Sequence, residues 1–94
     1  MHQENSKILS IVIPVFNEIN FLKELFEQIE TYFNKENIEI IVVDDGSTDG
    51  SSNLLNDLKK KKHYKFLLKL IKLDINSGKG KAIQTGIKNS KGEY

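Results

Sequence analysis

Three short runs of mostly apolar residues, rich in β-branched side chains, alternate along the chain with segments of helical periodicity. The runs lie at residues 8–13, 38–43 and 66–73, and we expect helices over 21–33, 49–62 and 81–89. Strands that alternate with helices through short connections form a parallel sheet with right-handed crossovers. The sequence therefore predicts a β-α-β-α-β-α order, which is half of a three-layer, doubly wound α/β domain.

The expected boundaries follow from the residues that flank each segment. Pro14 should end the first strand, because it cannot donate a ladder hydrogen bond, and Asn20 should cap the first helix. The lysines at 59–62 suit the negative end of the second helix dipole. Glu93 and Tyr94 resemble the start of a fourth strand, so we expect residues 1–94 to be the N-terminal part of a longer, truncated domain.

Charge and composition exclude several classes of protein. The net charge is +1, from 14 basic and 13 acidic residues, and every basic residue is lysine, so we expect no nucleic-acid partner. The chain has no cysteine, and no apolar stretch approaches the roughly 20 residues of a membrane span. We expect a soluble chain in the cytoplasm, and a full-length protein at the cytoplasmic face of a membrane.

Ligands of open α/β sheets bind outside the carboxyl ends of the strands, which selects three segments here. These segments are 14–18, 44–50 and 76–81. Asp44 and Asp45 could accept hydrogen bonds from a base or a ribose, or could belong to a structural turn in which Asp49 caps the next helix. A magnesium site of the kind found in phospho-receiver domains stays open, whereas the spacing of residues 45–56 does not fit an EF-hand.

The other two segments are each ambiguous alone. Phe16 could stack on a base or fill the core beneath its loop. The glycine-rich segment 76–81 could present N–H groups and Lys79 to a phosphate, or could be a flexible connection. It matches neither a Walker A loop nor a complete dinucleotide fingerprint.

Together, the three segments resemble the signatures of family-2 glycosyltransferases with the GT-A fold. Residues 10–18 (SIVIPVFNE) are similar to that family's opening strand and loop, and residues 42–50 (VVDDGSTDG) to its second-strand motif. Residues 76–87 resemble the third signature, N-x-G-K-G-x-A-x-x-x-G-I, which is typical of the branch that transfers sugars to dolichyl or undecaprenyl phosphate. The resemblance implies a Rossmann-like half of a GT-A domain over residues 1–94.

The resemblance also implies which residues bind the donor. In this family the first loop and the second-strand acid hold the base and ribose of a UDP- or GDP-sugar. The corresponding residues here are Pro14, Phe16, Glu18, Val43 and Asp45, with Asp44 beside them and Lys79 near the glycine loop. Phe16 stands where the family more often has tyrosine, so stacking is retained and a hydroxyl hydrogen bond is lost.

The family's D-x-D motif, which holds Mg²⁺ or Mn²⁺, and its general base should follow Tyr94, so we expect neither a metal ligand nor a catalytic residue in this chain. The resemblance implies a transferase that inverts the sugar's configuration and uses a lipid phosphate as acceptor, with the 94-residue chain inactive alone. Two alternatives remain, which are a non-catalytic Rossmann-type module for NAD or a mononucleotide, and a receiver-like signalling domain.

Overall fold

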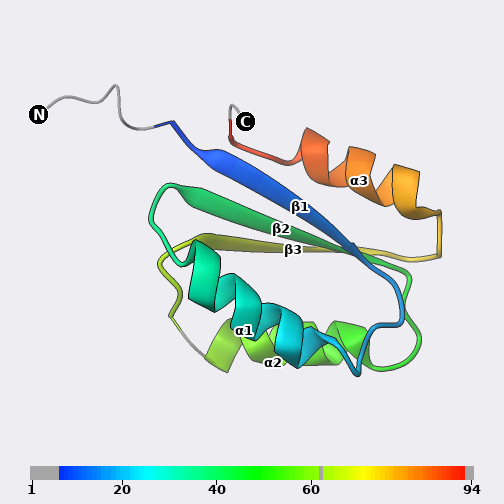
Figure 1. Ribbon diagram of the computed structural model, residues 1–94. Coiled ribbons are helices and arrows are strands. Elements are labelled where there is room, and N and C mark those ends of the chain that lie inside the picture. Colours follow the sequence, from blue (N-terminus) through cyan, green and yellow to red (C-terminus); the bar gives the residue numbers. More distant parts are fainter. Residues whose placement is uncertain (1–6, 62, 93–94) are drawn as a thin grey trace, which may run out of the picture.

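The computed structural model describes residues 7–61 and 63–92, which form three strands and three helices in strict alternation (Figure 1). The elements are β1 (Leu9–Val15), α1 (Leu22–Phe33), β2 (Ile38–Asp45), α2 (Ser51–Lys61), β3 (Leu67–Leu73) and α3 (Lys79–Lys88). This order is the predicted one. The described part of the chain is thus a Rossmann-like half of a three-layer α/β domain.

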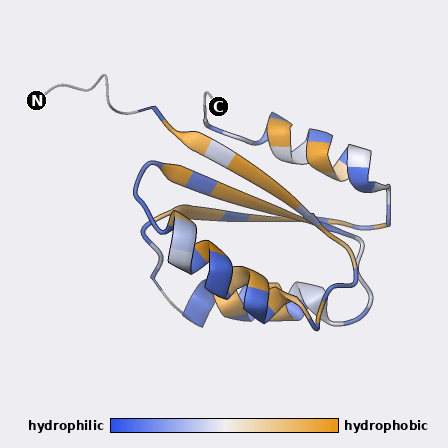
Figure 2. Cartoon of the chain, in the orientation of Figure 1, coloured by the Kyte–Doolittle hydropathy of each residue, from blue (hydrophilic) through white to orange (hydrophobic). Residues whose placement is uncertain are grey.

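The three strands form one parallel sheet in the order β1-β2-β3. The register pairs Leu9 with Ile38 and Glu39 with Leu67, so all three strands point the same way. All eight residues of the central strand β2 are buried, and Figure 2 shows the strands as largely hydrophobic. The loops that follow the strands therefore meet at one edge of the sheet.

Alternate residues of β2 serve opposite faces of the sheet, as the pleat of a strand requires. Ile40 and Val42 pack into the larger core beneath α1 and α2, together with Phe26 and Leu55. Ile41 and Val43 face α3, and the fully buried Ala82 packs against them. Figure 1 shows the resulting three layers, with α1 and α2 on one face and α3 on the other.

Several predicted boundaries were wrong. β1 continues through Pro14, which an edge strand of this sheet tolerates, and β2 includes Asp44 and Asp45. The first position of α1 is preceded by Phe21, whose side chain makes no capping bond, so Asn20 is not the cap. α3 begins two residues earlier than predicted. Lys62, Glu93 and Tyr94, which carried predictions of their own, lie outside the described residues.

Gly86 lets α3 lie directly on β1. A Cβ atom added at Gly86 would lie 2.3 Å from Cγ1 of Val12 and 3.1 Å from its Cγ2. We therefore expect Gly86→Ala to lower the free energy of unfolding by about 1–3 kcal/mol, the usual cost of overpacking. Urea unfolding would measure the loss. The double variant Gly86→Ala/Val12→Ala removes both methyl groups and should recover part of it, and no recovery would contradict this contact.

Across the described residues, none of the helices has the length and apolar character needed to span a bilayer.

Candidate functional site

The first two loops at the carboxyl edge are joined by reciprocal hydrogen bonds centred on Asn17. The Asn17 backbone N–H donates to Oγ of Ser47 (2.8 Å), and the Thr48 N–H donates to Oδ1 of Asn17 (2.8 Å). Asn17 has a φ of +52°, a left-handed conformation that asparagine tolerates better than most residues. The side chain thus holds together two loops that are 31 residues apart in the sequence.

Asp49 and Ser51 continue this junction toward the start of α2. Oδ2 of Asp49 accepts the Ile19 N–H (3.1 Å), and Oγ of the buried Ser51 accepts the Glu18 N–H (3.1 Å). The Ser51 hydroxyl donates to Oδ1 of Asp49 at 2.6 Å. That bond, with further backbone N–H donors and against an opposing effect of burial, holds the pKa of Asp49 below its ordinary value. Asp49 therefore has a structural role, because it joins the first loop to the start of α2.

Asp45 binds the third loop through both oxygens of its buried carboxylate. Oδ1 accepts the Ser77 N–H at 2.7 Å, and Oδ2 accepts the Gly78 N–H at 2.9 Å. Nδ2 of Asn76 donates to Oδ2 and to the Asp45 carbonyl oxygen, both at 3.2 Å. Asp45 thereby fixes the segment that leads into α3.

Asp44 points to the opposite face of the sheet, because neighbouring residues of a strand alternate. Its Oδ1 accepts the Ser47 N–H at 3.1 Å, and its Oδ2 accepts the Ser52 hydroxyl. Only 2% of Asp44 is exposed. Its oxygens thus tie the second loop to the first turn of α2.

A cleft opens between the first and third loops, above the carboxyl end of β2. Its volume is about 390 Å³, within the range typical of ligand pockets. The lining residues are Pro14, Val15, Phe16, Glu18, Asp45, Asn76, Gly78 and Lys79. An exposed aromatic face, an acid and a lysine thus surround one opening, with Asp45 at its base.

Five of the seven residues predicted to bind the donor line this cleft, and two do not. Val43 lies within the core under α3, and Asp44 lies on the other face. Val15, Asn76 and Gly78 line the cleft but were not among the predicted site residues. Asn76 could have been selected from its place at the head of the glycine-rich segment, where an amide can both donate and accept.

The described residues include no group of three or more histidine, aspartate or glutamate side chains that could hold a metal ion. Asp44 and Asp45 do not form a pair, because they face opposite sides of the sheet and each already accepts hydrogen bonds from the protein. A phospho-receiver-type magnesium site on these two residues does not fit this geometry.

The fold and the cleft define a Rossmann-like half domain whose polar loops gather at the carboxyl edge of a parallel sheet. The model of Glycosyl transferase family 2 matches residues 10–94, and this chain belongs to that family. The match includes all three cleft-forming segments.

Three relatives illustrate the range of this family. The chain is 40% identical to an uncharacterized glycosyltransferase of Rickettsia felis over 92% of the chain. It is 42% identical to a poly(ribitol-phosphate) beta-glucosyltransferase of Bacillus spizizenii over 92% of the chain. It is 35% identical to an undecaprenyl-phosphate 4-deoxy-4-formamido-L-arabinose transferase of Aeromonas hydrophila over 99% of the chain. The chain spans 13%, 13% and 28% of the lengths of these proteins, respectively.

Proposed function

We propose that the cleft binds the nucleoside part of a UDP- or GDP-sugar, and that this chain is the N-terminal, donor-binding part of a longer glycosyltransferase. The single observation that carries the proposal is the convergence of Phe16, Glu18 and Lys79 around one opening above Asp45. The membership of family 2 supplies the class of reaction.

The chemistry of each side chain fits a nucleotide. The exposed ring of Phe16 offers a face on which a base can stack. Glu18 can accept from ribose hydroxyls or from a base N–H. Lys79 begins α3, whose first-turn N–H groups and positive dipole end favour a phosphate. In this proposal Asp45 contributes mainly by holding the third loop, and Val43 and Asp44 support the cleft without lining it.

The acceptor we propose is a polyprenyl phosphate, reached by a full-length enzyme at the cytoplasmic face of a membrane. The segment 76–87 resembles the signature of that branch, and the Aeromonas relative is named for an undecaprenyl-phosphate substrate. Residues after Tyr94 would hold the divalent cation and would include the general base. The transfer would invert the configuration of the sugar. We expect the 94-residue chain to have no transferase activity alone.

Amide NMR spectra recorded during separate titrations with UDP, GDP and NAD would test the proposal. Selective shifts of the Phe16, Glu18, Asn76 and Lys79 amides with UDP or GDP would support it and identify the base. Shifts produced by NAD alone would favour the Rossmann-type module instead. A folded spectrum that none of the three nucleotides changes would contradict both.

Phe16→Ala should weaken nucleotide binding by about 5- to 150-fold, which corresponds to the 1–3 kcal/mol typical of base–aromatic stacking. Isothermal titration calorimetry with the preferred nucleotide would measure the dissociation constant. Phe21→Ala is a matched control, because Phe21 is 44% exposed against 45% for Phe16 and does not line the cleft. Equal losses in the two variants would argue against stacking on Phe16.

A further inference from the structure

Glu39 is a buried acid at the amino end of β2, opposite the end that carries the cleft. None of its surface is exposed, and it lies on the same face of the strand as Asp45, toward α3. Burying a carboxylate is costly unless its oxygens are paired or hydrogen-bonded. The partners of Glu39 therefore indicate why this otherwise apolar strand contains an acid.

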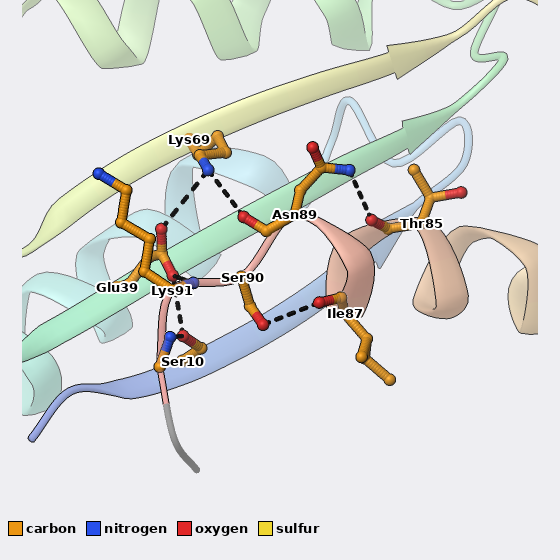
Figure 3. Close-up of polar contacts among 9 residues, drawn as sticks. Ser10, Glu39, Lys69, Thr85, Ile87, Asn89, Ser90 and Lys91 are labelled. Carbon is orange, nitrogen blue, oxygen red and sulfur yellow. Dashed lines mark hydrogen bonds and ion pairs between the residues drawn. The ribbon is translucent and has the colours of Figure 1, made fainter.

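The partners of Glu39 come from β1, from β3 and from the segment that follows α3 (Figure 3). Its Oε1 accepts the Lys91 N–H at 2.8 Å and the Ser10 hydroxyl at 2.8 Å. Oγ of Ser10 in turn accepts the Gly92 N–H at 2.8 Å. The pair Glu39–Ser10 thus captures two successive backbone N–H groups just beyond the end of the helix.

Lys69 of β3 is the third partner of Glu39. Nζ of Lys69 lies 3.7 Å from Oε2 of Glu39 and donates to the Asn89 carbonyl oxygen at 2.7 Å. Oε2 accepts no hydrogen bond from the described residues. Burial raises the pKa of Glu39, but the Lys91 N–H, the Ser10 hydroxyl and the charges of Lys69 and Lys91 outweigh it and leave the pKa below its ordinary value. The carboxylate is therefore charged at neutral pH.

Two carboxylates of one strand hold the two ends of one helix. Asp45 binds the N–H groups of Ser77 and Gly78 immediately before α3, and Glu39 binds the Lys91 N–H soon after it. Between them Ala82 and Gly86 rest on the sheet. Because a ten-residue helix moves as a stiff rod, its orientation at one end depends on how the other end is held.

From this geometry we propose that Glu39 is a positioning residue for the nucleotide cleft, acting through α3 to place Gly78 and Lys79 at its rim. This inference rests on the proposed function for its ligand, but its structural part is independent of any nucleotide. Among the described residues, the hydrogen bonds and the ion pair of Glu39 involve no residue of the cleft lining, so its effect must travel along the helix.

The test compares Glu39→Leu, which keeps the volume and removes both acceptors, with Glu39→Gln, which keeps one acceptor for Lys91 and Ser10. In the nucleotide-free chain, Glu39→Leu should speed hydrogen exchange of the Lys91 and Gly92 amides by about tenfold or more, the loss expected for a hydrogen bond to a charged group. The Ser77 and Gly78 amide resonances should move as well. Glu39→Gln should restore both readouts toward the parent values.

Nucleotide affinity is the second readout. We expect Glu39→Leu to weaken UDP or GDP binding by about 3- to 10-fold, which corresponds to about 0.7–1.4 kcal/mol of binding free energy. Glu39→Gln should stay within about twofold of the parent. Glu36→Gln, in the exposed turn before β2, is the control for loss of a negative charge nearby.

Three results would overturn the inference. In the first, the Ser77 and Gly78 amide resonances of Glu39→Leu do not move although hydrogen exchange at Lys91 is fast. In the second, the Leu and Gln variants give the same resonances and exchange rates. In the third, neither variant changes the affinity for the nucleotide. If Glu39→Leu does not fold, Ser10→Ala removes one link of the same pair and gives the same two readouts. If the parent chain binds no nucleotide, the proposed function fails, and the amide resonances alone then decide whether Glu39 positions α3.

Discussion

Replacing Gly46 with alanine should lower the free energy of unfolding by about 2–6 kcal/mol, because two costs of about 1–3 kcal/mol each act at this position. The first is conformational, since Gly46 has a φ of +75° that L side chains rarely adopt. The second is steric, since an added Cβ would lie 2.5 Å from both the Asn76 nitrogen and the Ile75 carbonyl carbon. Backbone atoms cannot move aside as a side chain can.

The same contact links stability to the cleft. Gly46 follows Asp45 directly, and the backbone against which it packs leads to Asn76, which lines the cleft. A shift of this segment would move the Ser77 and Gly78 N–H groups away from the Asp45 carboxylate. We therefore expect Gly46→Ala to lose nucleotide binding together with stability.

Urea unfolding followed by circular dichroism would measure the change, with Gly80→Ala as the matched control. An added Cβ at Gly80 meets nothing within 4 Å, and its φ lies outside the left-handed range. Gly80 lies in α3, where alanine is the better helix former by up to about 1 kcal/mol. The two substitutions should therefore change stability in opposite directions. A Gly46→Ala chain as stable as the parent would contradict the close approach of the two loops.

Periodicity predicted the order and type of every element because β-branched runs and amphipathic stripes are local properties of the sequence. The boundaries that failed depended on tertiary contacts. Pro14 stays within a strand because β1 is at the edge of this sheet, and the buried Asp45 stays within β2 because the distant third loop satisfies its oxygens. No local pattern reports such long-range partners.

The cleft was predictable in outline and not in detail. The rule of carboxyl strand ends selected the right loops, and the family resemblance selected five residues of the lining. The rule and the resemblance do not show that Asp45 binds the third loop whereas Asp44 binds the second loop and α2. Alternation along a strand implies only that the two side chains face opposite sides of the sheet. Glu39 went unnoticed, because a single acid in an apolar run gives no sign of partners near residues 10 and 91.

The adjacent aspartates should respond differently to the same isosteric change. Oδ1 and Oδ2 of Asp45 each accept a backbone N–H, from Ser77 and from Gly78. Whichever way an asparagine side chain is turned at this position, its NH₂ group faces a fixed N–H donor. We therefore expect Asp45→Asn to lower the free energy of unfolding by about 2–4 kcal/mol, since a lost charged hydrogen bond and an unsatisfied buried donor act together.

Asp44→Asn avoids this conflict, because only one of its oxygens faces a backbone N–H. The amide oxygen can keep the bond from the Ser47 N–H, while the NH₂ group donates to the Ser52 hydroxyl, which can rotate to accept it. We expect a loss of at most about 1 kcal/mol, the net worth of an ordinary hydrogen bond.

Nucleotide titration of the two variants would distinguish an effect on the cleft from an effect on stability alone. Asp45→Asn should weaken UDP or GDP binding by about tenfold or more. Displacement of Gly78 and Lys79 would remove at least one contact to the nucleotide, and a contact of about 1.4 kcal/mol accounts for a tenfold change in affinity. Asp44→Asn should change the affinity by no more than about twofold, because Asp44 points away from the cleft. Equal losses would contradict the separate roles of the two carboxylates, and a reversed order would place the donor on the α2 side of the sheet.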